Sequence, residues 1–330
     1  MKILLAVSGG ADSIYLASRA GDFFPGAEFA AAHCNFSLRG AESDGDEQFV
    51  RDWCASKGIT LFCKRFDTQA YASQNGISVE MAARDLRYAW FAQLCHEQGF
   101  QAVAVAHNAN DNAETLMLNL LRGTGSRGLR GMGAQSEIIA GGKPLTILRP
   151  MLEISRPEIE ATLMKEGTAW REDSTNREND ARRNKIRNLV FPVFAEINPS
   201  FLRTLGRDMD HFCQADDIAE DYFRNSGLSM EVGVDIRKLL SLKHWEYILF
   251  RLLEPYNLSE ETFGKLVELL KSGRTISGKV FQSPTHIVFI ERKTLSAKPR
   301  ESREALYSNF IIFATKIFSE GGNREGLGSE

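Results

Sequence analysis

Short apolar runs alternate with longer amphipathic segments through the first part of the chain. The apolar runs are each followed by turn residues, as is typical of buried strands, and they cover residues 2–7, 28–36, 59–66 and 101–107. Between them, residues 47–58 and 78–99 space their apolar side chains at helical intervals and end at glycines. Strands that alternate with helices form a parallel sheet covered on both faces. We therefore expect an α/β fold with a doubly wound, mainly parallel sheet.

The pattern changes after Pro150. A short helix and a polar stretch lead into a mostly helical region, which ends in a hairpin or two short strands over residues 278–292. We place the domain boundary between residues 198 and 199. The expected organisation is a sheet domain over residues 1–198, a second, mainly helical C-terminal domain over residues 199–318 and a disordered, Gly-rich tail over residues 319–330.

Composition and charge restrict the class of protein. The 330 residues are 43% hydrophobic and carry a net charge of −3, which argues against a strongly basic nucleic-acid coat but allows a local basic face. The five cysteines contain no C-x-x-C pair, so a zinc ribbon or an iron–sulfur ligand set has no support. Met1-Lys2 leads directly into a strand, and no apolar run approaches the ~18 residues of a membrane span. We expect a cytoplasmic protein with no secretory leader and no membrane association.

The loop after the first strand has the composition of a phosphate cradle. Its sequence, SGGADS, places Gly9 and Gly10 where the chain turns from a strand into a helix, at the end of a parallel sheet where ligands bind. Backbone N–H groups, the helix N-terminus and the hydroxyls of Ser8 and Ser13 would together face an anion. A plain strand-to-helix turn, capped by Asp12 and Ser13, is the alternative.

This loop is not a Walker A motif, because no Gly-Lys-Ser/Thr follows. It resembles the S-G-G-x-D-S signature of the PP-loop pyrophosphatase superfamily, whose fold is Rossmann-like. The resemblance implies an enzyme that cleaves ATP between the α and β phosphates, adenylates a substrate oxygen and leaves pyrophosphate in the loop. It assigns ATP binding to the loop residues Ser8, Gly9, Gly10, Ala11, Asp12 and Ser13.

Two other glycine-rich stretches match nucleotide-binding patterns less well. Residues 123–128 satisfy G-x-G-x-x-G but follow a helix rather than a strand. Residues 273–280 come close to a P-loop, but Val280 stands where a metal-binding hydroxyl is needed. We interpret both as turns.

Five further stretches identify one branch of the superfamily. They are HCNFSLRG (33–40), EMAARDLRY (80–88), AHNANDNAETLMLNLLRGTG (106–125), WREDSTN (170–176) and RRNKIRNLVFP (182–192). In this order they resemble the tRNA(Ile)-lysidine synthetase family, densely over residues 1–200 and loosely beyond. The resemblance implies ligation of L-lysine to C2 of the wobble cytidine of tRNA(Ile) with a CAU anticodon, through an adenylated cytidine, with release of AMP and pyrophosphate. ATP and Mg²⁺ are the implied substrate and cofactor, and the sequence names no ligands for Mg²⁺.

Asp111 and Glu114 are the implied lysine-binding and catalytic carboxylates. They lie three residues apart on one helix, so both point to the same side, at the carboxyl end of a strand. The resemblance places both on the cationic groups of lysine, and either could accept a proton from the ε-amine, which titrates near ~10.4 when free. Without the resemblance, an acidic first helical turn is the simpler interpretation.

Arginines and two strand-end residues complete the implied site. Arg84 and Arg87 could form a surface ion-pair stripe with Glu80. The resemblance instead implies that they contact the ATP phosphates or the tRNA. It assigns Arg84 a catalytic role and Arg87 a role in tRNA binding. His33 and Asn35 fall in the family's adenine and substrate loop and are assigned to ATP binding. In that loop Phe36-Ser37 replace the His-Gly of the usual H-x-N-H-G-L-R form. His107 is expected to be a hydrogen-bonded structural residue.

The basic segment 177–187 is the implied tRNA contact. Its arginines suit phosphates, and an interleaved asparagine suits a base edge, whereas a solvated charged face is the usual meaning of such a run. The residues assigned to tRNA binding are Arg87, Arg122, Arg183, Asn184 and Arg187.

Several alternatives stay open. Another PP-loop tRNA-modifying enzyme or amide ligase is one, although thiolation usually needs paired cysteines, and a non-catalytic nucleotide-binding module is another. The sequence leaves monomer and homodimer both possible. Larger family members carry a further C-terminal domain with a basic, Gly-containing motif; this sequence lacks it, so we expect either a short-form enzyme or a truncated one.

Overall fold

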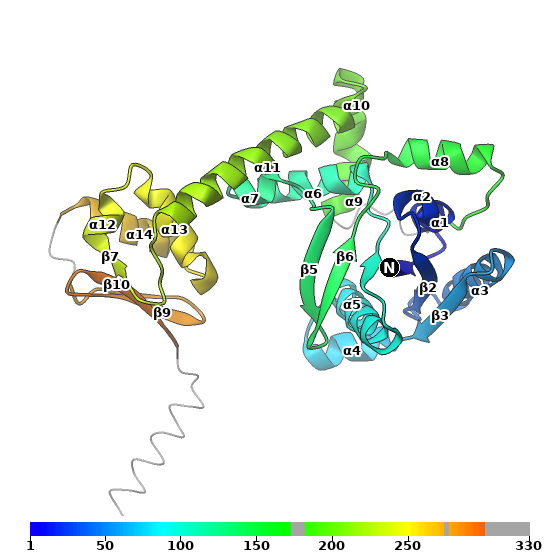
Figure 1. Ribbon diagram of the computed structural model, residues 1–330, viewed down its shortest axis with the longest axis horizontal. Helices are drawn as coiled ribbons and strands as arrows, with labels where there is room; N and C mark the ends of the chain where they lie inside the picture. Colours follow the sequence, from blue (N-terminus) through cyan, green and yellow to red (C-terminus); the bar gives the residue numbers. More distant parts are fainter. Residues whose placement is uncertain (173–181, 274–276, 301–330) are drawn as a thin grey trace, which may run out of the picture. The chain divides into compact units, whose positions relative to one another are not determined.

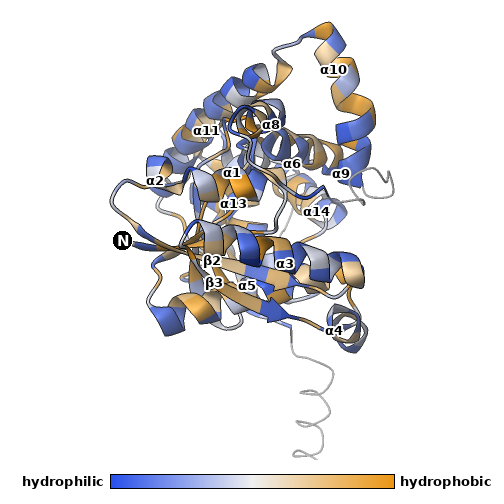
Figure 2. Cartoon of the chain, turned by 90° about the vertical axis from the view of Figure 1, so that its right-hand side faces the viewer, coloured by the Kyte–Doolittle hydropathy of each residue, from blue (hydrophilic) through white to orange (hydrophobic). Residues whose placement is uncertain are grey.

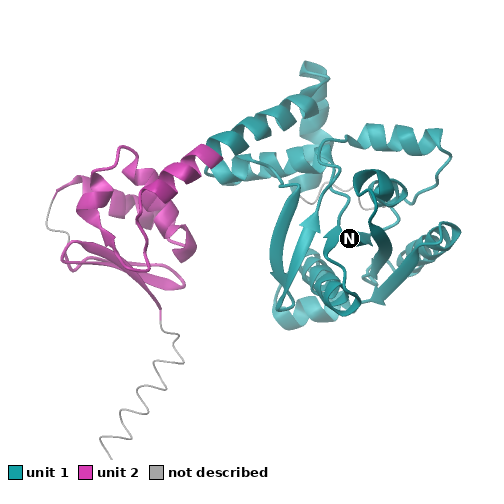
Figure 3. Ribbon diagram, viewed as in Figure 1, with its two compact units in different colours: residues 1–216 teal, residues 217–330 magenta. Residues whose placement is uncertain are grey.

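A computed structural model of the chain describes residues 1–172, 182–273 and 277–300. By their contacts the residues form two compact units, Met1–Asp216 and Asp217–Glu330 (Figure 3). The division falls inside the long helix α11 (Phe201–Asn225), later than the predicted boundary at 198–199, because the first part of that helix packs onto the first unit. The predicted tail 319–330 lies outside the described residues.

The first unit is built on a six-stranded sheet with the order β3-β2-β1-β4-β6-β5 (Figure 1). The strands are β1 (Lys2–Ala6), β2 (Glu28–Asn35), β3 (Thr60–Arg65), β4 (Ala102–Ala104), β5 (Gln135–Ala140) and β6 (Lys143–Leu148). All neighbours pair in parallel except β5, which runs antiparallel to β6 at one edge. The mainly parallel α/β sheet is confirmed, and the β5–β6 hairpin was not predicted.

Helices cover both faces of this sheet because successive side chains of a buried strand point to opposite sides. In β1, Ile3 and Leu5 enter one core and Leu4 the other, and all three are fully buried. The first core is shared with α1 (Ala11–Ser18), α2 (Ala20–Phe23), α3 (Ala41–Ser56) and α8 (Arg156–Lys165). The second core is covered chiefly by α5 (Val79–Gln98), beside α4 (Thr68–Asn75). In Figure 2 hydrophobic colour runs along the strands, while the surrounding helices carry both colours.

A group of helices packs at the carboxyl end of the sheet. It comprises α6 (Ala109–Arg122), α7 (Ser126–Leu129), α9 (Arg182–Lys185), the π-helix η2 (Ile186–Val190), α10 (Phe191–Ile197) and the start of α11. Ala113, Ile186 and Phe191 are buried between them. The buried carboxylate of Asp216 in α11 accepts hydrogen bonds from Ser126 Oγ (2.6 Å) and Arg130 Nη1 (3.0 Å). This polar link docks α11 on the turn after α6.

The second unit packs helices on a small antiparallel sheet with the order β7-β10-β9-β8. Its elements are β7 (Val234–Asp235), α12 (Ile236–Leu240), α13 (Trp245–Leu253), η3 (Glu254–Tyr256), α14 (Glu260–Lys271), β8 (Val280–Gln282), β9 (His286–Glu291) and β10 (Thr294–Pro299). The predicted hairpin is confirmed as β8–β9, and β7 and β10 extend it to a sheet. Among the described helices of both units, none is long and apolar enough to cross a bilayer.

Candidate active site

The loop between β1 and α1 is shaped by the hydroxyl of Ser13. Its Oγ accepts from the backbone N–H groups of Ser8 and Gly9, both at 3.1 Å, and donates to the carbonyl oxygen of Gly10 at 2.9 Å. The Oγ atoms of Ser8 and Ser13 are 3.1 Å apart. Gly9 adopts φ +98°, a conformation that favours glycine. The loop therefore turns sharply, and Ser13 holds the turn from inside.

The start of α1 at Gly10 is not crowded by other side chains. Gly10 is the N-cap of α1 and offers no side-chain cap, so N–H groups of the first helical turn are available to an anion. A Cβ added at Gly10 would meet only Ser8 Oγ at 3.6 Å and the Arg171 carbonyl at 3.9 Å. A Cβ at Gly9 would instead press on Val50 at 3.3 Å. Open space lies on the Gly10 side, which is the side where a ligand would approach.

Asp12 connects the phosphate loop to two other elements. Its Oδ1 accepts from Asn108 Nδ2 at 3.0 Å and its Oδ2 from Arg156 Nη1 at 2.7 Å. Burial raises the pKa of the Asp12 carboxyl, and the charge of Arg156 opposes that shift. Asn108 is also the N-cap of α6, where it forms a reciprocal capping box with Asp111. The Asn108 side chain thus links the Asp12 carboxylate to the backbone N–H of Asp111.

Asp111 and Glu114 lie on one side of α6, as the spacing predicted, and both are paired with Arg187. Its Nε donates to Glu114 Oε1 at 2.6 Å, and its Nη2 donates to Glu114 Oε2 at 3.1 Å and to Asp111 Oδ1 at 3.2 Å. Arg183 Nε lies 3.5 Å from Glu114 Oε2, and its Nη2 donates to Thr115 Oγ1 at 3.1 Å. The structure therefore brings the two carboxylates and the basic segment into one site.

The two carboxylates differ in exposure. Glu114 is fully buried, whereas the side chain of Asp111 is 17% exposed. Burial raises the pKa of the Glu114 carboxyl, and the hydrogen bonds and charge of Arg187 limit the rise. Burial alone would lower the pKa of Arg187, but its bonds to Glu114 outweigh that effect and raise it. Glu114 holds the arginine in place, and Asp111 remains the more accessible of the two acids.

His33 and Asn35 lie beside the phosphate loop, on β2 next to β1, and are almost fully buried. The Nδ1 of His33 donates to the Val7 carbonyl at 2.9 Å, and burial chiefly lowers the pKa of this imidazole. The Nδ2 of Asn35 donates to Glu47 Oε2 at 2.9 Å. Both residues support the end of the sheet, and their contact with ATP stays a prediction.

Arg84 and Arg87 lie near the amino end of α5, each over an aromatic ring. The guanidinium of Arg84 is 5.0 Å from the Tyr88 ring centre, and that of Arg87 is 5.2 Å from the ring of Phe36. Phe36 is followed by Ser37, whose φ of +54° is a left-handed backbone conformation that glycine would adopt without strain.

The remaining tRNA-binding candidates are placed differently. Arg122 ends α6, about 16 Å along the helix axis from Asp111, so the structure does not bring it to the carboxylates. Asn184 lies on α9 between Arg183 and Arg187. The start of the basic segment, including Arg177, lies outside the described residues.

Three arginines were missed in the sequence, and one histidine was misjudged. Arg156 pairs with Asp12, and the backbone N–H of Arg171 donates to the Gly9 carbonyl at 2.9 Å. Arg149 follows β6 directly, and its Nε is buried with no hydrogen-bond partner. His107 also differs from the expected hydrogen-bonded residue, because its buried Nδ1 has no partner. The positions of Arg149 directly after β6 and of Arg156 at the start of α8 were the available signal, and Arg171 carried none.

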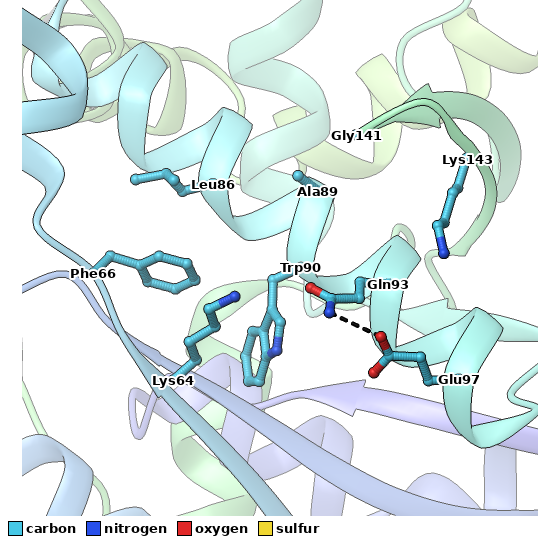
Figure 4. A pocket seen from close by; sticks show the side chains of 9 residues that line it. All are labelled: Lys64, Phe66, Leu86, Ala89, Trp90, Gln93, Glu97, Gly141 and Lys143. Atoms are coloured by element: carbon cyan, nitrogen blue, oxygen red, sulfur yellow. Dashed lines mark hydrogen bonds between the residues drawn. The ribbon is translucent and has the colours of Figure 1, made fainter. Parts of the chain in front are cut away.

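Two observations concern the surroundings of the site. Within the described parts of the chain, no group of three or more His, Cys, Asp or Glu side chains is arranged to hold a metal ion. A cavity of about 320 Å³ lies on the outer side of α5, between the Phe66 and Trp90 rings and the Gly141 turn (Figure 4). None of its lining residues belongs to the site around the phosphate loop.

Comparison with known proteins gives the same assignment in both units. Residues 1–194 match the model of the PP-loop domain, and residues 229–300 match that of the TilS substrate binding domain. The chain is 39% identical to the tRNA(Ile)-lysidine synthase of Porphyromonas gingivalis (strain ATCC BAA-308 / W83) over 90% of its own length and 63% of that protein. It is 37% identical to the tRNA(Ile)-lysidine synthase of Chlorobaculum tepidum (strain ATCC 49652 / DSM 12025 / NBRC 103806 / TLS), over 83% of this chain and 85% of that protein.

A solved structure supports the fold. The U34-tRNA thiolase NcsA from Methanococcus maripaludis superimposes with a TM-score of 0.53 at 17% identity, covering 65% of this chain and 73% of that one. The chain spans about 63% of the length of the two Porphyromonas gingivalis relatives.

Proposed function

This chain belongs to the tRNA(Ile)-lysidine synthase family, and from that membership we propose that it joins L-lysine to C2 of the wobble cytidine of a CAU-anticodon tRNA(Ile) while converting ATP to AMP and pyrophosphate. One observation carries the proposal beyond family membership. The Asn108 side chain donates to the Asp12 carboxylate and accepts from the backbone N–H of Asp111, so it ties the phosphate loop to the acidic start of α6. A ligase that brings a nucleotide and an amine together needs this arrangement.

In the proposed first step, the O2 atom of cytidine attacks the α-phosphorus of ATP. The bond between that phosphorus and the bridging oxygen breaks, and pyrophosphate leaves. The N–H groups at the start of α1 and the Ser8 hydroxyl face its charge, and no side chain at Gly10 obstructs it. Mg²⁺ carried by ATP supplies further neutralisation of the phosphates. We assign it no protein ligand.

In the proposed second step, the ε-amine of lysine attacks C2, a C–N bond forms and AMP leaves with the former O2. The ammonium must first lose a proton, because its ordinary pKa is near ~10.4. The pair of acids is positioned to hold a cationic group of lysine and to take that proton. Asp111 makes the direct contact with the ammonium group of lysine, at the position that Arg187 Nη2 occupies in the structure. The buried Glu114 holds Arg187.

The basic residues of the same site are proposed to meet the tRNA. Arg183 and Arg187 lie beside the carboxylates, with Asn184 between them, and Arg84 and Arg87 lie on α5 over the rings of Tyr88 and Phe36. Guanidinium groups suit phosphate oxygens, and an asparagine suits a base edge. A cytoplasmic setting, where tRNA and ATP are available, belongs to this proposal.

The decisive experiment mixes the purified chain with ATP, L-lysine and a CAU-anticodon tRNA(Ile) transcript and measures pyrophosphate release and the mass of the anticodon nucleoside. We expect release to require all three substrates and the wobble cytidine to gain one lysine. Release with a different acceptor would identify another PP-loop ligase. Binding of ATP without any pyrophosphate release would identify a nucleotide-binding module.

A further inference from the structure

Two buried hydrogen-bonding nitrogens lack partners at the carboxyl edge of the sheet. They are Arg149 Nε and His107 Nδ1, and they are the buried side-chain polar atoms without a partner among the described residues of the first unit. A buried polar atom without a hydrogen-bond partner is unfavourable, so such groups are usually paired with water or a ligand. Two of them next to each other indicate a polar ligand.

The two residues are neighbours because their strands are paired. Ala104 of β4 lies opposite Leu148 of β6, and the N–H of Val105 donates to the Leu148 carbonyl at 2.9 Å. Arg149 and His107 follow these strands at the edge where ligands of parallel sheets bind. The other side of the Arg149 guanidinium is fixed, since its Nη1 donates to the Gly133 carbonyl (2.9 Å) and to Ser136 Oγ (3.0 Å).

The charges around this pair favour an anion beside a cation. Burial, together with the nearby charges of Arg149, Arg183 and Arg84, lowers the pKa of His107 to about 4, and the charge of Asp111 acts in the opposite direction. The imidazole is therefore neutral at pH 7, and Arg149 supplies the positive charge. Asp111 lies in the first turn of α6, four residues after His107. A positive group and a carboxylate thus lie close together.

We propose that Arg149 and His107 bind the carboxylate of the lysine substrate, next to Asp111, which holds one of its ammonium groups. This assignment rests on the proposed function. A free amino acid carries both charges, which complements a guanidinium next to an acid. A phosphate group is also an anion, but Asp111 would repel it, and a phosphate has no ammonium to place there.

The test compares lysine with lysinamide, whose carboxylate is replaced by a neutral amide. The wild-type protein, Arg149→Gln and Arg149→Lys are assayed for pyrophosphate release at saturating ATP and tRNA. We expect the wild type to favour lysine over lysinamide. Arg149→Gln should raise the KM for lysine at least tenfold, leave the KM for lysinamide unchanged and so abolish the preference, while Arg149→Lys should retain part of it. Arg19→Gln, which removes a guanidinium near the far end of α1, is the matched control and should behave as wild type.

Other outcomes overturn the assignment. If Arg149→Gln raises the KM for tRNA or ATP and keeps the preference for lysine, the ligand is a phosphate. If Arg149→Gln raises the KM for lysine and the KM for lysinamide equally, Arg149 has only a structural role. Equal wild-type affinity for the two amines, measured by calorimetry without any variant, would also refute it, so the test survives a variant that fails to fold. A wild-type protein that accepts neither amine refutes the proposed function instead.

Discussion

Replacing Arg187 with glutamine would leave the buried carboxylate of Glu114 without its main partner. Arg187 donates to both oxygens of Glu114, at 2.6 and 3.1 Å, and Glu114 is fully buried. Removing one partner of a buried ion pair typically destabilises a protein by about 3–5 kcal/mol. The Arg187 side chain is 32% exposed, so water can reach part of the gap, and Arg183 stays near. We therefore expect Arg187→Gln to lower the free energy of unfolding by about 2–3 kcal/mol at pH 8.

The loss of stability in Arg187→Gln should be smaller at low pH than at high pH. Burial raises the pKa of Glu114 in the folded protein above its ordinary value of 4.5. Between the unfolded and folded pKa the folded protein binds more protons, so this carboxyl contributes less stability as pH rises through that window. Without Arg187 the folded pKa rises further, by an amount worth about 1.4 kcal/mol per unit. Arg187→Gln should therefore be less destabilised, relative to wild type, at pH 5 than at pH 8.

Urea unfolding followed by tryptophan fluorescence at pH 5 and pH 8 measures both effects. Glu114→Gln is the matched variant, since it leaves Arg187 paired with Asp111 and partly in water, and we expect it to be destabilised by only about 1 kcal/mol. The double variant should lose the extra pH dependence. Equal unfolding midpoints for Arg187→Gln and wild type at both pH values would refute the reasoning, as would a larger loss at pH 5.

Four further predictions test other parts of the site. Gly10→Val should fold but bind ATP at least tenfold more weakly by calorimetry, whereas Gly9→Ala should lower stability by about 1–3 kcal/mol, because it combines φ +98° with a 3.3 Å contact to Val50. Ser37→Gly should raise the free energy of unfolding by up to about 1 kcal/mol in urea melts, since φ +54° is unfavourable for serine. Asp111→Asn, which keeps an acceptor for the helix cap, should reduce lysine incorporation at least ~100-fold while ATP affinity stays within a factor of two. Arg183→Gln should weaken tRNA binding and flatten its log–log salt slope by somewhat less than ~1, and an unchanged slope would place Arg183 outside the tRNA contact.

The parts of the fold that were predictable are those specified locally. The run before Ser8 is continuously apolar, and the glycines after it can be recognised without knowing any distant partner, so β1 and the phosphate loop followed directly from the sequence. The β5–β6 hairpin carried a usable signal that was missed, because Gly141-Gly142, a residue pair typical of a two-residue hairpin turn, separates the two strands. The antiparallel sheet of the second unit depends on β7 pairing with β10 far along the chain, which no local pattern specifies.

In the candidate site, too, local features could be predicted from the sequence and contacts between distant residues could not. The spacing of Asp111 and Glu114 correctly predicted a shared helix face, but nothing near them in the sequence indicated that Arg187 would bind both. Interactions between such distant positions arise from packing of the helices after β4 and near residue 190, and they become visible only in the folded chain. The unpartnered nitrogens of His107 and Arg149 are of this kind too, because a missing contact has no sequence pattern.

The cap of α6 restricts evolution more than an ordinary helix cap does. Serine, threonine, aspartate and asparagine usually replace one another at an N-cap with small changes in stability. Asn108 uses its amide oxygen to accept from the Asp111 N–H at 3.0 Å and its amide nitrogen to donate to Asp12 at 3.0 Å. Aspartate would still cap the helix but would replace a donor with a third negative charge, and serine or threonine is too short to span both partners. The usual N-cap substitutes therefore cannot keep both hydrogen bonds. Slow chemical deamidation of Asn108 would break its link to Asp12 without changing the size of the side chain, and would leave Arg156, which donates to Asp12 and to Asn110 of α6, as the remaining bridge.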